Sequence, residues 1–512
     1  MTFQWNKLQN GSDIRGIAIS HGDEEANLSK EVAYAIGKAF VIWLRNKGYG
    51  NSKIKIGVGR DSRISGPDLL MAIASGLKRE GAEVIDCGLA STPAMFMGTI
   101  FKETDFAASV MITASHLPFN RNGFKFFTSD GGLEKEDITE ILSIASKNFS
   151  NEPMDKAELS SFDLMSLYSN LFVDIIKRGV ASENFNNPLD SMRIVVDAGN
   201  GAGGFFVEKV LKVLGADTKG SQFLEPDGMF PNHEPNPEND EAMRAIQEAV
   251  VKSKADLGII FDTDVDRSAI VDSSGEIINR NKLIALMAAI VLAEHPSTTI
   301  VTDSVTSEGL TYFIEKILGG RHHRFKRGYK NVINEAIRLN ESGEECYLAI
   351  ETSGHGAMKE NYFLDDGAYM AAKIIIKAAL LRKEGRSILD LIKDMPLPVE
   401  EKEFRIKLLD DDFKAQGQAI IEELKKHVSI VDGWVPAQKN FEGYRVSCTN
   451  IDEKGWFLLR LSLHDPVLPL NVESEVIGGV KNIAVKLCDF LKRFENIDYS
   501  SLSKYAKNND NS

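Results

Sequence analysis

Ser115 stands where a side-chain hydroxyl can face an open cleft. Residues 113–118 read TASHLP, between a strand predicted over residues 107–113 and a shorter one predicted over 124–128. Loops at strand ends commonly carry functional side chains. The run taken alone fits an ordinary turn equally well, because serine, proline, asparagine and glycine all favour turns. The later motifs make Ser115 the candidate carrier of a phosphoryl group.

An acidic run follows a second predicted strand. Residues 262–267 read DTDVDR, directly after an apolar stretch over 255–261. The carboxylates occupy alternate positions, at Asp262, Asp264 and Asp266. They would repel one another without a cation, and hard oxygen ligands suit Mg²⁺. A calcium loop is disfavoured, because Arg267 and Ser273 stand where it needs glycine and glutamate. A solvated acidic turn is the alternative.

A third strand end delivers groups suited to a sugar. Residues 351–356 read ETSGHG after a strand predicted over 346–350. Glu351 and Ser353 offer an acceptor and a donor for neighbouring hydroxyl groups. His355 titrates near neutral pH, so this side chain can carry a proton. A lone histidine is more often structural, but this one is flanked by glycines.

Two basic loops are suited to anions. Residues 12–16 read SDIRG, and the guanidinium of Arg15 on a glycine-flanked loop suits phosphate. Residues 321–330 read RHHRFKRGYK, a local positive patch in an acidic chain. A surface arginine and a solvated basic loop are the plain alternatives.

A glycine-rich turn indicates a different class of protein. Residues 199–204 read GNGAGG after a strand predicted over 193–197, with Glu225 at a distance typical of dinucleotide-binding proteins. This pattern would suit an NAD-dependent oxidoreductase. Tight strand-to-helix packing explains the same glycines, and we favour that interpretation.

Helices and strands must alternate to position these loops. A helix is predicted from a cap at Ser29 to Gly48, and a long amphipathic helix over 162–178 closes the first region. The following regions repeat the strand-then-helix pattern, which indicates mixed, largely parallel sheets. Near the C-terminus, two strands over 444–447 and 456–462 precede a helix over 476–494. Residues 497–512 are polar and are predicted to fray.

The chain is therefore predicted to be an α/β protein with three successive mixed α/β sheet domains and a smaller α+β C-terminal domain around a central cleft. The predicted boundaries are residues 1–188 with the serine loop, 189–297 with the acidic run, 298–397 with the sugar-type loop, and 398–512. A chain of 512 residues is long enough for roughly three to four domains.

The composition of the chain restricts the kinds of partner that it is expected to bind. The net charge of −14 disfavours nucleic-acid binding, and the longest uncharged apolar run, residues 283–293, is too short to span a membrane. The four cysteines form no CxxC pair, so neither zinc nor a disulfide framework is indicated. A cytoplasmic location fits best, and an organellar location with a removed leader stays open.

Several motifs, in order, resemble the α-D-phosphohexomutase family, which includes phosphoglucomutase and phosphomannomutase. The resemblance covers nearly the whole chain. Residues 113–118 resemble the family's phosphoserine loop, with Leu117 where asparagine is usual. The other matching segments are the metal loop over 262–267, the sugar-binding loop over 351–355, and two second-domain segments over 196–203 and 230–237.

The chain departs from the family in the loop that normally grips the phosphate that is not transferred. Residues 460–466 read RLSLHDP, where members usually have Arg-x-Ser-(Gly or Asn)-Thr-(Glu or Thr)-Pro. Leu463 replaces a small residue, His464 replaces a threonine, and Pro469 stands where arginine is common. Substrate choice and the balance of the reaction are thereby left open.

The resemblance implies a mechanism in which phosphorylated Ser115 passes its phosphoryl group to a hexose phosphate, with Mg²⁺ as cofactor and a sugar bisphosphate as intermediate or activator. The implied catalytic residues are Ser115, Lys125, His355 and Arg15, with Lys125 or His355 as the proton carrier. The implied substrate-binding residues are His116, Arg267, Lys326, Arg327, Glu351, Ser353, Arg460, Ser462 and His464. The implied metal ligands are Asp262, Asp264, Asp266 and phosphorylated Ser115.

Other functions compete with a mutase. A sugar-bisphosphate synthase of the same fold would release glucose 1,6-bisphosphate and reload Ser115 from a donor such as fructose 1,6-bisphosphate. A non-catalytic sugar-phosphate sensor and an oxidoreductase are further alternatives. The sequence leaves open which hexose phosphate is used, which donor is used and the oligomeric state.

Overall fold

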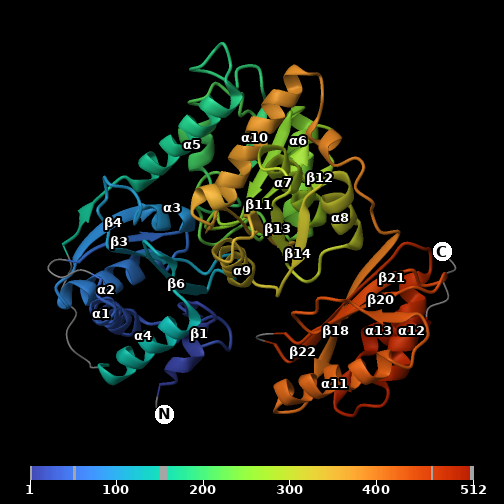
Figure 1. The fold of residues 1–512 in the computed structure, drawn as a ribbon. Coiled ribbons are helices and arrows are strands. Elements are labelled where there is room, and N and C mark those ends of the chain that lie inside the picture. Colours follow the sequence, from blue (N-terminus) through green and yellow to red (C-terminus); the bar gives the residue numbers. More distant parts are fainter. Residues whose placement is uncertain (1–2, 50–53, 150–157, 463–464, 508–512) are drawn as a thin grey trace. The chain divides into compact units, whose positions relative to one another are not determined.

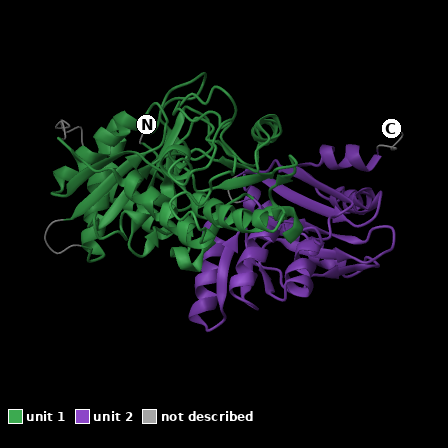
Figure 2. Cartoon of the chain, turned by 90° about the horizontal axis from the view of Figure 1, so that it is seen from above, with its two compact units in different colours: residues 1–283, 353–391 green, residues 284–352, 392–512 purple. Residues whose placement is uncertain are grey.

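The computed structural model describes residues 3–49, 54–149, 158–462 and 465–507. The chain divides into two compact units, shown in different colours in Figure 2. The first unit comprises residues 1–283 and 353–391, and the second comprises residues 284–352 and 392–512. Within the described ranges, no helix combines the length and the apolar character needed to cross a membrane.

The first unit begins with a mixed sheet and the helices that cover it (Figure 1). The strands follow the order β1-β2-β6-β5-β3-β4-β8, with β7 beside β6. Their bounds are β1 Gln9–Asn10, β2 Asp13–Ile17, β3 Lys55–Arg60, β4 Glu83–Leu89, β5 Ala108–Ile112, β6 Arg121–Thr128, β7 Gly131–Gly132 and β8 Ser160–Ser161. The helices are α1 Lys30–Asn46, α2 Gly66–Arg79, α3 Thr92–Met97, α4 Lys135–Lys147 and α5 Leu164–Val180, after a short 3₁₀ turn at Trp5–Leu8.

Local sequence explains these elements. The Ser29 side chain accepts a hydrogen bond from the Val32 amide and caps α1 as predicted. In β3, Ile56 and Val58 pack into the core formed with α1 and α2. Gly59, which follows Val58, faces α3, where an added Cβ would lie 2.5 Å from the Met95 sulfur. This alternation lets β3 carry helices on both faces.

The second sheet of the first unit holds the acidic run. Its strands follow the order β12-β11-β10-β9, and β9 is parallel to β10. The bounds are β9 Ile194–Asp197, β10 Leu257–Phe261, β11 Ser268–Asp272 and β12 Ile277–Ile278. The helices of this region are α6 Asp240–Ser253 and α7 Asn281–Glu294. After β9 the chain forms a glycine turn and a π-helix at Phe206–Leu211. A Cβ on Gly201 would lie 2.6 Å from the Thr263 carbonyl oxygen, so close packing explains a glycine there.

The first unit also contains the segment 353–391. The hairpin of β16 (Gly356–Met358) and β17 (Leu364–Asp365) leads, past a 3₁₀ turn at Lys359–Asn361, into α10 (Gly367–Lys383) and a final 3₁₀ turn at Ile388–Leu391. Helix α10 lies against α5, and Gly179 approaches Ile376 so closely that an added Cβ would be 2.6 Å from it.

In the second unit, β13 lies between β14 and β15 and is parallel to both. The bounds are β13 Thr299–Thr302, β14 Arg321–Arg324 and β15 Cys346–Ile350, with α8 Glu308–Tyr312, a π-helix at Phe313–Ile317 and α9 Tyr329–Glu341. The interpretation of residues 321–330 as one basic loop was wrong, because its first four residues form β14. His322 fits into the sheet because it hydrogen-bonds to Thr302 and Thr311, at 2.7 and 2.8 Å.

The C-terminal part of the second unit is a smaller α+β region with the strand order β19-β20-β21-β22-β18-β23. The strands are β18 Glu400–Leu408, β19 Trp434–Pro436, β20 Tyr444–Cys448, β21 Gly455–Leu459, β22 Val467–Ser474 and β23 Ile497–Asp498, and the helices are α11 Phe413–Val428, α12 Gly479–Leu491 and α13 Ser500–Lys507. The expected fraying of residues 497–512 was wrong for 497–507, because Leu502 is fully buried in this core. The predicted succession of three α/β regions and an α+β region is confirmed.

Candidate active site

Ser115 lies just after β5, on a turn whose backbone is fixed locally. Its φ angle is 51°, in the left-handed region that non-glycine residues seldom adopt. The Ser115 amide donates a hydrogen bond of 2.9 Å to the Thr113 hydroxyl. The Ser115 hydroxyl donates one of 3.1 Å to Oδ2 of Asp262. The serine thus projects from its sheet toward the acidic run of the second sheet.

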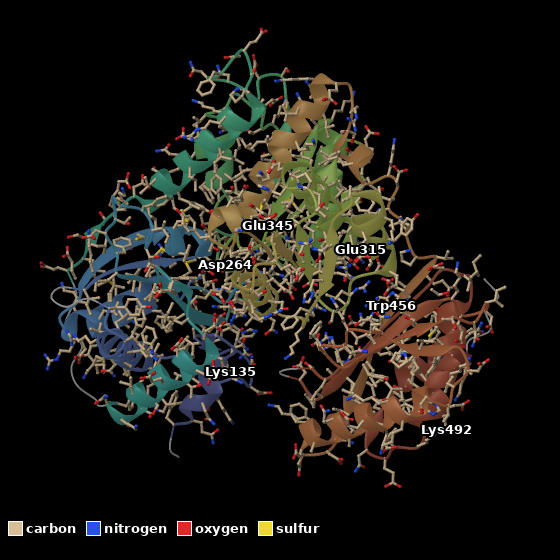
Figure 3. All side chains as sticks on the ribbon, viewed as in Figure 1. Lys135, Asp264, Glu315, Glu345, Trp456 and Lys492 are labelled. Atoms are coloured by element: carbon tan, nitrogen blue, oxygen red, sulfur yellow. The ribbon has the colours of Figure 1, made fainter. Side chains whose placement is uncertain are left out.

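The three aspartates of the acidic run converge beside this serine. One oxygen from each of Asp262, Asp264 and Asp266 lies within 4.8 Å of the others, and all three side chains are buried. Asp264, labelled in Figure 3, accepts a hydrogen bond from the Thr92 hydroxyl at the start of α3. Among the residues that the structure describes, Oδ1 of Asp264 and Oδ1 of Asp266 have no hydrogen-bond partner. Such unpaired buried oxygens suit a cation.

Burial and neighbouring charges shift the pKa values of Asp262 and Asp266 in opposite directions. Burial raises the pKa of Asp262 well above its ordinary value, and the charges of Asp266 and Asp264 raise it further. Burial also works to raise the pKa of Asp266, but Lys125, His355 and Arg267 outweigh it and lower that pKa. The neighbouring cations therefore favour the charged form of Asp266, whereas burial and the adjacent carboxylates favour the protonated form of Asp262.

Lys125 reaches the same cluster from β6. Its ammonium nitrogen lies 2.6 Å from Oδ2 of Asp266 and 3.3 Å from Oδ2 of Asp264. The side chain is almost fully buried, so these ion pairs are poorly screened by solvent. The ammonium group is therefore held at the junction of the first and second sheets.

Arg267 links the acidic run to the serine loop. Its guanidinium is 3.2 Å from Oδ2 of Asp262, donates to the Ser115 hydroxyl at 3.4 Å, and donates to Nδ1 of His116 at 2.7 Å. A nitrogen that accepts from a guanidinium carries no proton itself. Burial, Arg267 and Arg15 lower the pKa of His116 to about 3, so its imidazole is neutral at physiological pH.

We expect the His116 ring to show no titration between about pH 5 and pH 8 in the folded, metal-free protein. Below the ordinary value of 6.5 the unfolded chain binds a proton at His116, whereas the folded chain does so only near about 3. The contribution of His116 to folding free energy therefore becomes less favourable as pH falls through this window. Histidine NMR chemical shifts, assigned with a His116→Gln variant, would check this. A midpoint near pH 6 would contradict it.

His355 is held by an aspartate that the sequence had not singled out. Its Nδ1 lies 2.5 Å from Oδ2 of Asp365, and the other oxygen of Asp365 accepts from the Gly356 amide at 2.9 Å. The same Nδ1 is 3.9 Å from Asp266. Burial works to lower the pKa of His355, but Asp365 and Asp266 outweigh it and raise that pKa. This ring thus adjoins the acidic cluster with a fixed orientation.

Two further predicted residues belong to the first unit. Arg15 lies in β2 beside β6, is paired with Asp13 at 2.9 Å, and acts electrostatically on His116. Ser353 is buried in the turn that precedes β16. The structure therefore brings most of the predicted catalytic and metal-binding residues together in one unit.

Another group of predicted residues gathers in the second unit. Arg460 is buried at the end of β21, and its Nη1 is 3.7 Å from Oε1 of Glu442. The other oxygen of Glu442 accepts from the Arg327 amide at 3.0 Å and from the Ser304 hydroxyl at 2.5 Å. Oε1 of Glu351 accepts from the Gly328 amide at 2.6 Å.

The other residues predicted to bind the substrate are Lys326, Ser462 and His464. The ammonium of Lys326 lies 5.8 Å from the centre of the Phe325 ring. The Ser462 hydroxyl accepts from the Asp465 amide at 3.3 Å, beyond the end of β21. His464 and Leu463 lie outside the residues that the structure describes.

Sequence reasoning missed several groups at the site. Thr92, Asp365 and the pair Asp61 and Arg63 were given no role. Asp61 and Arg63 come directly after β3, and a position at a strand end is the same signal that selected Ser115. Asp365 opens an acidic pair at the end of a short strand, which would have been a usable signal. Thr92 had none.

Family models match three successive stretches of the chain. Residues 6–152 match "Phosphoglucomutase/phosphomannomutase, alpha/beta/alpha domain I". Residues 170–275 match domain II of the same family, and residues 279–398 match domain III. The matches therefore follow the order in which the domains are numbered.

Relatives and solved structures agree with these matches. The chain is 32% identical over 473 residues to a phosphomannomutase/phosphoglucomutase of Pseudomonas syringae pv. tomato, covering 92% of each chain. It is 30% identical over 478 residues to a phosphoglucomutase of Neisseria gonorrhoeae, covering 92% of this chain and 94% of the relative. A crystal structure of a phosphoglucomutase/phosphomannomutase family protein from Burkholderia thailandensis superposes with a TM-score of 0.74 at 26% identity, covering 94% of this chain and 96% of the other.

Proposed function

This chain belongs to the phosphoglucomutase/phosphomannomutase family of enzymes, and we propose that it interconverts hexose 1-phosphate and hexose 6-phosphate through a phosphoserine at Ser115. A bisphosphate of the sugar would be the intermediate. The observation that carries the proposal is the contact of 3.1 Å between the Ser115 hydroxyl and Asp262, at the edge of a buried triad of aspartates.

The triad fits Mg²⁺. Three carboxylate oxygens lie within 4.8 Å of one another, and Oδ1 of Asp264 and Oδ1 of Asp266 have no hydrogen-bond partner among the described residues, so the donor set has the hard oxygen character that this ion requires. We propose that Asp262, Asp264 and Asp266 hold the ion together with the phosphorylated Ser115. When bound, it would supply positive charge that stabilises the phosphoryl oxygens.

The surrounding cations would stabilise the phosphoryl group during transfer. The bond between Oγ of Ser115 and phosphorus breaks while a bond forms from phosphorus to a sugar hydroxyl, whose proton passes to a base. Arg267, Arg15 and Lys125 would offset the charge on the phosphoryl oxygens, and the neutral His116 would accept from Arg267 and fix its direction. Lys125 and His355 are the two candidates for the base.

The other residues that the family resemblance assigns to the substrate would bind its sugar and its second phosphate. Glu351, together with Ser353 on the following turn, would hold sugar hydroxyl groups, which two opposite orientations of the intermediate can both satisfy. Arg460 and Ser462, with His464, would hold the phosphate that is not transferred, and Lys326 and Arg327 would add positive charge. The buried Nε of Arg460 has no hydrogen-bond partner among the described residues, which supports a role in binding an anion.

Replacing Arg460 by methionine should weaken substrate binding more than it slows chemistry. Loss of a charged hydrogen bond to phosphate would raise the KM for hexose 1-phosphate roughly 10- to 100-fold, with a smaller change in kcat. Steady-state kinetics would measure this, and Arg493→Met, in the exposed turn after α12, is the matched control. An unchanged KM in the Arg460 variant would remove this residue from the binding site.

A phosphorus NMR time course tests the function itself. The purified protein is given Mg²⁺ and glucose 1-phosphate or mannose 1-phosphate, with and without fructose 1,6-bisphosphate. Conversion to the 6-phosphate, sustained by traces of bisphosphate, is the expected result. Accumulation of glucose 1,6-bisphosphate in step with loss of fructose 1,6-bisphosphate would instead identify a synthase. No conversion of either sugar phosphate would contradict the proposal.

A further inference from the structure

Arg63 contacts the backbone of the loop that carries Ser115 and has no part in the mechanism described above. It follows β3 in the run RDSR at residues 60–63, and its side chain is fully buried. A buried guanidinium is costly unless each of its donors finds an acceptor, so its partners indicate what it does.

Those partners are backbone carbonyl groups of one loop. The two terminal nitrogens of Arg63 donate to the carbonyl oxygens of Leu117 at 2.6 Å, Pro118 at 2.7 Å and Arg121 at 3.0 Å, and also to that of Ser115. The guanidinium is planar and rigid, so four acceptors around it are fixed relative to one another. The carbonyl of Ser115 itself is one of them, which ties the nucleophile's own backbone to this arginine.

Asp61 completes the arrangement from the other side. Its Oδ2 is 3.2 Å from Nε of Arg63 and accepts from the Thr113 hydroxyl at 2.7 Å. The Thr113 hydroxyl in turn accepts from the Ser115 amide. Both the amide and the carbonyl of Ser115 are therefore bound to one network, which explains how a serine keeps a left-handed φ of 51°.

A loop of the second sheet region covers this network. Phe230 places its ring 5.2 Å from Cζ of Arg63. Gly228 packs so closely that an added Cβ would lie 2.5 Å from the carbonyl oxygen of Ser62 and from the amide of Ile64. Residues of the region that holds the aspartates therefore pack against the turn that contains Arg63. This packing excludes water from the hydrogen bonds of Arg63.

We propose that Arg63 is a positioning residue, which with Asp61 and Thr113 fixes the Ser115 backbone so that the serine oxygen stays aligned with the aspartate triad throughout phosphoryl transfer. This inference rests on the proposed function of Ser115. A serine that must both give and receive a phosphoryl group needs one fixed direction, because small misalignments slow transfer steeply.

The test compares Arg63→Lys and Thr113→Val with the wild-type enzyme. Lysine keeps the charge but cannot span four carbonyl groups, and valine keeps the shape of threonine but loses both hydrogen bonds of its hydroxyl. We expect kcat to fall about 10²-fold in Arg63→Lys, with KM changed by less than about threefold. Thr113→Val should show the same pattern with a smaller loss, which keeps the inference testable if the arginine variant does not fold.

Two further measurements separate positioning from plain stability. The phosphorus resonance of phosphorylated Ser115 should shift or broaden in both variants. Thr104→Val is the matched control, a buried threonine of the same sheet region whose hydroxyl donates to the carbonyls of Gly98 and Phe101. It should lower the melting temperature without changing kcat or the resonance.

The outcomes distinguish this inference from the proposed function. If Arg63→Lys and Thr113→Val keep the wild-type kcat and resonance while Ser115→Ala is inactive, the positioning role is wrong and the phosphoserine stands. If Ser115→Ala remains active, the proposed function fails and the inference falls with it.

Discussion

The Ser115→Ala variant is expected to lose mutase activity by about 10⁴-fold or more, the scale seen when the nucleophile of a covalent mechanism is removed. The nearby Thr113 hydroxyl is not available to replace it, since Thr113 is already bound to Asp61 and to the Ser115 amide. The loss should appear in kcat for both directions of the reaction, because the same oxygen gives and receives the phosphoryl group. Coupled assays of 6-phosphate formation would measure it.

Two controls accompany this prediction. Ser146→Ala, on the exposed face of α4, should retain full activity and an unchanged melting temperature. The Ser115 variant should fold normally, because it removes one hydroxyl whose contacts are to Asp262, His116 and Arg267. Substantial turnover by a folded Ser115→Ala protein would refute the proposed chemistry.

Replacing Asp264 by asparagine should lower activity roughly 10³-fold, because the metal site would lose one of its three charges. A second effect distinguishes a metal site from a structural acidic cluster. In wild type, burial and the charges of Asp266 and Asp264 raise the pKa of Asp262, so the metal-free cluster is strained by repulsion. The variant relieves that repulsion, and its metal-free melting temperature should be no lower than that of wild type.

Calorimetry with and without Mg²⁺ would check this second effect. Mg²⁺ should raise the melting temperature of wild type and leave that of Asp264→Asn almost unchanged, since a ligand stabilises only the state that binds it. Mn²⁺ titration followed by electron paramagnetic resonance gives a direct measure of binding. Asp174→Asn, an exposed change on α5, is the control that should keep both responses. Equal Mg²⁺ stabilisation of the two proteins would remove Asp264 from the metal site.

The sequence identified strand ends well, and with them the main groups of the site. Ser115 and the acidic run both follow short, wholly buried and mostly apolar strands, β5 and β10. The cap at Ser29 likewise marked the start of α1. Each of these signals depends only on residues close together in the sequence, so it could be recognised without knowledge of the fold.

Contacts between distant segments could not be read in this way. Lys125 meets Asp266 across 141 residues of chain, and Arg63 meets the carbonyl of Ser115 across 52. Arg63 in particular is an ordinary surface residue type whose burial depends on carbonyl groups that only the folded loop presents. Pairing of this kind follows from tertiary packing, which no spacing rule in the sequence encodes.

In two regions the polar or charged composition of the sequence led to a wrong prediction of the local structure. The charged residues of β14 suggested a loop, yet the strand forms because His322 and Arg324 satisfy their polar groups on neighbouring threonines. The polar C-terminal stretch suggested fraying, yet Leu502 anchors α13 to the core. In both cases a few specific contacts outweigh the average polarity of the segment.

A single-turnover experiment tests the central claim most directly. Purified protein carrying ¹⁸O-labelled phosphate on Ser115 is mixed with a stoichiometric amount of hexose 1-phosphate and Mg²⁺, quenched at short times, and examined by peptide mass spectrometry and phosphorus NMR. We expect the labelled phosphate to leave the Ser115 peptide and appear in the sugar phosphates within the first turnover, while unlabelled phosphate from the substrate replaces it on Ser115. Interconversion of the sugar phosphates while the labelled phosphate stays on Ser115 would contradict the proposed mechanism.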